Sequence, residues 1–175
     1  MRKNVKKQLA LRVLSTAALV AMVSSIATAA FADTYDLTKG SVEIVAKDGI
    51  QSITQRDDTG AFVKDEKGEN IDNRQDDDIT LTTKNKDTGE TATTGEIKTT
   101  HNAITIDAEK GNTAKVTLDN VNIDVYGSSK AALTVTGDGN TEIELNGDNT
   151  LISGRGHAGL EKADDVSHGS LTIKD

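Results

Sequence analysis

The sequence predicts an all-β protein in which short parallel strands stack as a β-solenoid. Within residues 102–154 two similar blocks follow one another, and apolar and polar residues alternate in both, as in strands with one buried face. Asn, Asp and Gly separate these strands, and these residue types favour tight turns. The chain has no proline to interrupt a hydrogen-bonded ladder, and its 2% of aromatic residues is too little for a large aromatic core.

The two blocks repeat with a nearly constant length. The separation is 29 residues from Ile104 to Leu133, and it is 27 residues from Val116 to Ile143. A repeat of this length, built from strands and turns, predicts coils whose inward side chains stack on their equivalents in the next coil. We expect eight apolar residues to point inward: Ile104, Ile106, Leu118, Val121, Leu133, Val135, Ile143 and Leu145.

Residues 1–32 have the organisation of a secretory signal peptide. Four basic residues lie within the first seven, an apolar run covers 13–30, and Ala30-Phe31-Ala32 forms a small-x-small cleavage motif before Asp33. A membrane anchor is the alternative, because the apolar run is of borderline length. We expect cleavage between Ala32 and Asp33, which gives a secreted or cell-surface product without a membrane segment.

Removal of the predicted signal peptide makes the chain strongly acidic. It takes away five basic residues and no acidic ones, so the mature net charge is 15 − 28 = −13. Such a surface repels nucleic acid and anionic lipid headgroups. Neutral sugars, cationic partners and divalent cations remain compatible with it.

The segments before the repeat are expected to form its first coil or its cap. Residues 35–44 have the pattern of a strand, a turn and a second strand. Residues 55–78 are polar, and Gly68 marks either the turn of a projecting hairpin or part of a disordered segment. We therefore expect a β-helix domain over 33–175, with a polar insertion or hairpin at about 55–96.

The end of the sequence resembles an incomplete third coil. Leu171 and Ile173 lie 28 residues beyond Ile143 and Leu145, and the chain stops two residues later. No capping segment is visible, although a solenoid end normally carries one. The expectation is a truncated solenoid or an end closed by a partner, and the open strand edge favours end-to-end self-association.

One predicted corner stacks Asp119 and Asn120 on residues 146–149. Asn and Asp at such a corner can satisfy backbone groups of the neighbouring coil and accept left-handed conformations. The alternative is a Ca²⁺ site, because carboxylate and amide oxygens are suitable ligands for that cation. Its candidate ligands are Asp119, Asp124 and Asp148.

A second predicted corner places Tyr126 above Gly154, next to Arg155 and His157. An aromatic face beside polar side chains could hold a sugar by stacking and hydrogen bonding. The alternative is an ordinary loop with a half-buried tyrosine. Tyr126, Arg155 and His157 are the candidate carbohydrate-binding residues.

Motifs of known catalytic sites are absent from the sequence. It contains no G-x-S-x-G or H-E-x-x-H motif and no cysteine. A polysaccharide lyase would need carboxylates or a basic residue clustered on one face of the strands, and the pattern shows no dense cluster. We expect a non-enzyme, with a weak lyase as the remaining catalytic alternative.

Four segments together resemble a family of secreted bacterial carbohydrate-binding domain proteins. They are YDLTKGSV at 35–42, VTLDNVNI at 116–123, IELNGDNTL at 143–151 and HAGL at 157–160. The resemblance implies a right-handed parallel β-helix, related in shape to pectate lyases. It also implies binding of acidic plant polysaccharide such as polygalacturonate, with calcium and without strong lyase activity. The predicted function is an exported, non-catalytic polysaccharide-binding module, and the alternative is an adhesin-like surface solenoid that binds a protein.

Overall fold

The computed structural model describes residues 33–84, 96–163 and 168–175 and shows an all-β chain with parallel sheets. This confirms the predicted all-β class; the described part contains no α-helix. It has one 3₁₀ turn, η1 (Leu37–Lys39). The strands are β1 (Thr34–Asp36), β2 (Ser41–Lys47), β3 (Ile50–Arg56), β4 (Arg74–Gln75), β5 (Ile79–Thr82), β6 (Ile104–Ala108), β7 (Thr113–Asp119), β8 (Asn122–Asp124), β9 (Leu133–Thr136), β10 (Asn140–Asn146), β11 (Thr150–Ile152), β12 (Leu160–Lys162) and β13 (Leu171–Lys174).

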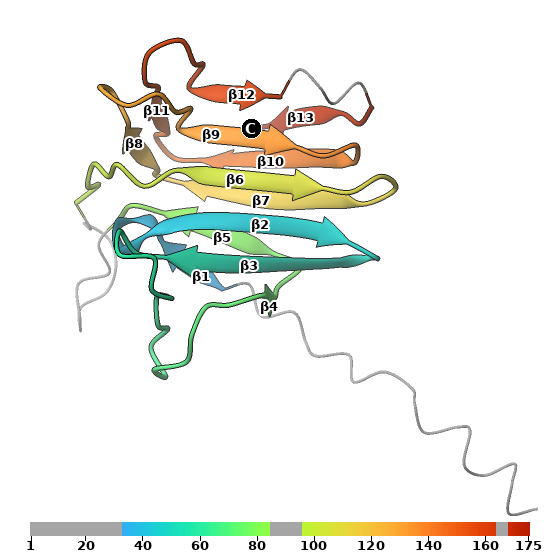
Figure 1. Cartoon of the computed structure of the whole chain (residues 1–175), viewed down its shortest axis with the longest axis horizontal. Helices are drawn as coiled ribbons and strands as arrows, with labels where there is room; N and C mark the ends of the chain where they lie inside the picture. Colours follow the sequence, from blue (N-terminus) through green and yellow to red (C-terminus); the bar gives the residue numbers. More distant parts are fainter. Residues whose placement is uncertain (1–32, 85–95, 164–167) are drawn as a thin grey trace, which may run out of the picture. The chain divides into compact units, whose positions relative to one another are not determined.

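Strands from successive repeats pair in parallel, as Figure 1 shows for β6 with β9 and for β7 with β10. Ile104 pairs with Leu133, which confirms the equivalence predicted from the first strand of each block. Val116 pairs with Ile143 as predicted, and β8 pairs with β11 in parallel. Equivalent strands of successive sequence repeats therefore pair with one another.

The core lies between these sheets and consists of aliphatic side chains. Seven of the eight residues predicted to point inward are at most 2% exposed. Leu145 is the exception, because it is half-buried and packs against the edge of the core. Alternation of apolar and polar residues thus identified the buried face of each repeat strand.

The N-terminal segments add both parallel and antiparallel strands to the sheets. β1 pairs in parallel with β5, and β2 pairs in parallel with β6. β2 also pairs with β3 as an antiparallel hairpin, which the sequence reading missed. Its turn contains Asp48 and Gly49 with φ of 52° and 77°, and an Asp-Gly pair between strands is a strong hairpin signal.

A hairpin forms within the predicted insertion of 55–78, and part of it packs on the core. Lys64 and Asn70 form an antiparallel bridge, and Gly68 lies in the turn with φ of 81°. Val63 and Ile71 are buried in the main core cluster. These two apolar side chains attach the base of the hairpin to the core, whereas residues 66–70 around its turn are exposed. The rest of the predicted insertion, 85–95, lies outside the described residues, as does the predicted signal peptide.

The third repeat is paired in a register shifted from the predicted one. Ile173 pairs with Ile143, whereas the repeat length predicted Leu171 at that position. The reason is the length of the preceding connection. The chain between the end of β12 at Lys162 and the start of β13 at Leu171 is longer than the turn between β9 and β10. Leu171 and Ile173 are two residues apart in the sequence, so both side chains lie on one face of the strand. The shift therefore leaves the inward and outward faces of β13 unchanged.

Candidate functional site

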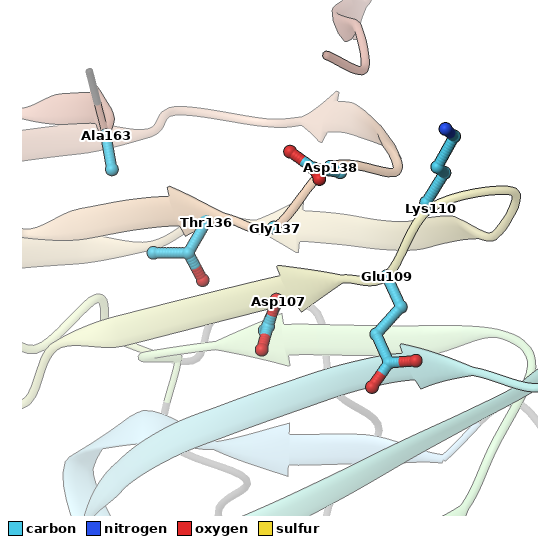
Figure 2. Close-up of a pocket in the computed structure, with 7 residues that line it drawn as sticks. All are labelled: Asp107, Glu109, Lys110, Thr136, Gly137, Asp138 and Ala163. Atoms are coloured by element: carbon cyan, nitrogen blue, oxygen red, sulfur yellow. The ribbon is translucent and has the colours of Figure 1, made fainter. Parts of the chain in front are cut away.

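An open depression of about 600 Å³ lies where β6 and β9 end. Figure 2 shows that its side chains come from these strand ends and from the turns that follow them. The lining residues are Asp107, Glu109, Lys110, Thr136, Gly137, Asp138 and Ala163. Three of these side chains are carboxylates and one is an ammonium, so the depression is polar and carries net negative charge.

Close approach of backbone at Gly137 forms part of this depression. A Cβ atom at Gly137 would lie 2.2 Å from the carbonyl oxygen of Ala108 and 2.4 Å from Oδ1 of Asp107. Its φ of +80° is also unfavourable for other residues. Glycine is therefore required for the second turn to lie directly on the first and to bring Asp138 near Asp107.

An ion pair ties one carboxylate of the depression to the neighbouring strand. Nζ of Lys47, at the end of β2, lies 2.6 Å from Oε1 of Glu109. The hydrogen bond to Glu109 raises the pKa of Lys47. Because both side chains are about half exposed, the pair contributes little stability. It does orient Glu109, and Figure 2 shows Lys110 pointing away from Glu109 on the other side of the turn.

The predicted Tyr126 corner is built differently from the expectation. Gly154 does not lie under Tyr126: a Cβ at Gly154 would be 2.3 Å from the carbonyl oxygen of Ser128, and the Arg155 N–H donates to that oxygen at 3.0 Å. Ser128 therefore occupies the position next to Gly154 that was predicted for Tyr126. The intervening residues form the turn from Val125 to Ser128, which is closed by a hydrogen bond of 3.0 Å. Tyr126 in this turn is 80% exposed, so the half-buried tyrosine of the ordinary-loop alternative is wrong.

His157 is connected to the outer face of the sheet formed by β6, β9 and β12. Its Nδ1 lies 2.9 Å from Oε2 of Glu161, which pairs in register with Thr134 on β9. The hydrogen bond from His157 lowers the pKa of Glu161. Tyr126 lies in the connection from β8 to β9, and the depression lies where β9 ends.

The predicted Asp119 corner forms a ladder of amide and carboxylate groups. Oδ1 of Asp119 accepts hydrogen bonds from the side-chain amides of Asn120 at 2.7 Å and Asn146 at 3.0 Å. The Asp148 N–H donates to Oδ1 of Asn120 at 3.3 Å, and the Val121 N–H donates to the Asn149 side chain at 2.9 Å. These contacts are those expected of a corner that satisfies backbone groups.

Asp124 lies apart from that ladder, on β8. Its Oδ1 accepts a hydrogen bond of 2.9 Å from the Tyr126 N–H, and its carbonyl oxygen contacts Nδ1 of His101. No three His, Cys, Asp or Glu residues gather in a metal-binding arrangement within residues 33–84, 96–163 and 168–175. The structure brings Asp119 and Asp148 to one corner and leaves Asp124 at another.

The sequence reading missed the depression, although a signal for it was present. Asp107 follows the last large inward residue of β6, and Asp138 follows the equivalent strand of the next repeat, within Thr136-Gly137-Asp138-Gly139. Carboxyl ends of parallel strands meet at the same edge of a sheet. Pairing of the two turns could therefore have been predicted from the repeat length.

No family model, curated protein or solved structure matches the chain. The resemblance to secreted carbohydrate-binding proteins thus stays a prediction. Among the described residues, no helix is both long and apolar enough to cross a membrane.

Proposed function

We propose that the described repeats wind as a right-handed parallel β-helix. In-register pairing of β6 with β9 and β12, of β7 with β10 and β13, and of β8 with β11 supports this proposal. Paired strands also follow one another at nearly constant separation along the chain, as is typical of successive coils. The handedness follows from the strong preference for right-handed connections between parallel strands.

We further propose that the protein is an exported, non-catalytic polysaccharide-binding module. The observation that carries the proposal is the open polar depression at the ends of β6 and β9. Carboxylates accept hydrogen bonds from sugar hydroxyls, and the hydroxyl of Thr136, which donates to the Ile106 carbonyl at 3.3 Å, can accept one as well. An open surface site also suits a long chain, because an extended polymer can pass over it without entering an enclosed cavity.

The outer face of the sheet extends this site towards the Tyr126 corner. Thr105 pairs with Thr134 and Thr134 with Glu161, so three polar side chains form one row across β6, β9 and β12. A polysaccharide along β9 would contact this row between the depression and Tyr126, whose exposed ring is suited to stacking on a sugar. The mature charge of −13 favours a neutral polysaccharide, or an acidic one bridged by cations.

Replacement of Asp138 by Ala is expected to weaken glycan binding at least tenfold without changing the fold. Asp138 is exposed in the turn, and one charged hydrogen bond is worth about 1.5–3 kcal/mol. The measurement is a screen of neutral and acidic polysaccharides, followed by calorimetric titration of the best ligand. Tyr126→Ala should also weaken binding, by the loss of its stacking surface. Asp72→Ala, an exposed carboxylate on another part of the chain, is the matched control.

Three outcomes of this screen would contradict the proposal. Binding unaffected by Asp138→Ala and Tyr126→Ala would place the ligand elsewhere. Absence of binding to every polysaccharide, together with capture of a defined protein partner, would favour the adhesin-like alternative. Release of unsaturated sugar products would show a lyase, because the proposed module leaves its ligand intact.

We propose calcium assistance at the corner that holds Asp119 and Asp148. Asp119 uses Oδ1 for two amide donors, and Asp148 is exposed, so carboxylate oxygens remain at the surface. Ca²⁺ takes about six to eight oxygen ligands. Carbonyl groups, water or an acidic polysaccharide would have to supply the rest, so binding to the protein alone should be weak.

Addition of millimolar Ca²⁺ is expected to raise Tm by a few degrees, and excess chelator should reverse the change. A ligand that binds only the native state stabilises it by RT ln(1 + [L]/Kd), which is about 1.4 kcal/mol when calcium is tenfold above Kd. The measurement is thermal unfolding followed by circular dichroism. Asp148→Ala should abolish the response, whereas Asp72→Ala should retain it. A response retained in Asp148→Ala would assign the cation to another position.

A further inference from the structure

Asp33, the first residue after the predicted cleavage motif, is held at three points. Its N–H donates to Oδ2 of Asp76 at 3.4 Å. Its carbonyl oxygen accepts a hydrogen bond of 3.2 Å from the Thr80 N–H, and its carboxylate lies 3.8 Å from Nη1 of Arg74. The nitrogen that cleavage would release is therefore already directed at a carboxylate from a distant part of the chain.

That carboxylate is buried and receives its hydrogen bonds from neutral donors. Asp76 is 5% exposed, and the same Oδ2 accepts a hydrogen bond of 2.9 Å from the Tyr35 hydroxyl. Oδ1 accepts from the Asp78 N–H at 3.0 Å. Arg74, the nearby cation, makes its short ion pair with Asp65 at 2.7 Å instead. The buried charge lacks a close cationic partner among the contacts of the described residues.

Burial raises the pKa of both members of the hydrogen-bonded pair, Asp76 and Tyr35. It raises the pKa of Asp76 above the ordinary range of an aspartate, because the charged form loses hydration. Burial, and then the charge of Asp76, raise the pKa of Tyr35, which stays protonated as the donor. In the uncleaved chain, ionised Asp76 therefore reduces the free energy of unfolding at neutral pH.

We propose that cleavage after Ala32 creates the missing partner, because the new α-ammonium group of Asp33 forms a buried ion pair with Asp76. An export peptidase hydrolyses the Ala32–Asp33 peptide bond with one water molecule. The carboxylate stays on Ala32, and the amine stays on Asp33 and takes up a proton. Processing thus anchors β1 to the sheet through Asp76, between β4 and β5. The inference rests on the proposed export of the protein and is independent of its ligand.

The proposal predicts a definite dependence on pH. An ammonium group stabilised by a carboxylate has a raised pKa in the folded state. Its stabilisation is complete below the unfolded α-amino pKa of about 7.7–8.0 and is lost as pH rises through the folded value. Two neighbouring groups keep their charge state in that window: Tyr35 stays protonated because its pKa is raised, and Arg74 stays charged. The carboxylates of Asp33 and Asp76 also face this position.

The experiment first determines the amino terminus of the exported product by mass spectrometry after secretion of the full chain. It then compares two forms, one beginning at Asp33 and one beginning at Ala32. They differ by a single alanine that displaces the ammonium by one residue. The core lies between Tyr35 and Leu171, so neither form removes part of it.

The chain beginning at Asp33 is expected to have a Tm several degrees higher at pH 6.5, and this difference should close as the pH rises through the folded pKa of the α-amino group. Asp76→Asn should remove the difference, whereas Asp77→Asn, one residue away and exposed, should keep it. Equal Tm values in the wild type would overturn the proposal, as would a difference that persists in Asp76→Asn.

Titration of the α-amino nitrogen by NMR keeps the test valid if Asp76→Asn does not fold. Its pKa in the Asp33 form should be higher than in the Ala32 form, and equal values would overturn the ion pair. A mature terminus at another residue would overturn the processing step, and the glycan-binding screen would remain unaffected by that result.

Discussion

Leu118→Asp is expected to abolish the cooperative thermal transition or to lower Tm by more than about 10 °C. Leu118 is 1% exposed on β7, between Leu81 of β5 and Leu145 of β10. A carboxylate there would be buried without a partner, which costs several kcal/mol against a total stability of about 5–15 kcal/mol. Circular dichroism during heating measures the effect.

Thr117→Asp is the matched control, because it introduces the same carboxylate on the outer face of the same strand. Thr117 is half-buried and alternates with Leu118, so its side chain can reach water. We expect a change in Tm of a few degrees at most. A Leu118→Asp protein that melts like the control would show that the inner and outer faces of β7 are assigned the wrong way round.

Gly137→Ala is expected to lower the free energy of unfolding by about 2–5 kcal/mol, the sum of a conformational and a packing cost. The positive φ alone costs an alanine about 1–2 kcal/mol. Contact of the new Cβ with the Ala108 carbonyl at 2.2 Å adds a penalty typical of overpacking, about 1–3 kcal/mol. Urea denaturation measures the total, and the same substitution should weaken polysaccharide binding because it separates the two turns of the depression.

Gly156→Ala separates the two contributions to that cost. Gly156 has a similar φ of +78°, but a Cβ there would meet no atom within 4 Å. The control should therefore lose only the conformational part, about 1–2 kcal/mol. Equal losses in both variants would mean that Gly137 is not pressed against Ala108 and that the turns of the depression are further apart.

Local pattern determined the strands and their buried faces. Alternation of apolar and polar residues depends only on neighbours in the chain, so it identified Ile104, Leu118 and Ile143 as inward residues before any pairing was known. The repeat length predicted which strands pair. An Asp-Gly signal for the hairpin at Asp48 was equally local and was overlooked.

Tertiary structure alone decided the contacts that depend on the lengths of connections. A longer connection before β13 moved Ile173 onto Ile143, and the wider turn after Val125 moved Tyr126 out of the stack. The alternation within a strand does not reveal either shift, because each shift leaves the inward and outward positions of the strand unchanged.

The depression at Asp107 and the contact of Asp33 with Asp76 have the same origin. Each forms where chain segments far apart in sequence close on one another. The repeat length predicts that the turns after β6 and β9 stack. The space left between these turns and the contact of Asp33 with Asp76 depend on how far each loop advances the chain before the next strand begins.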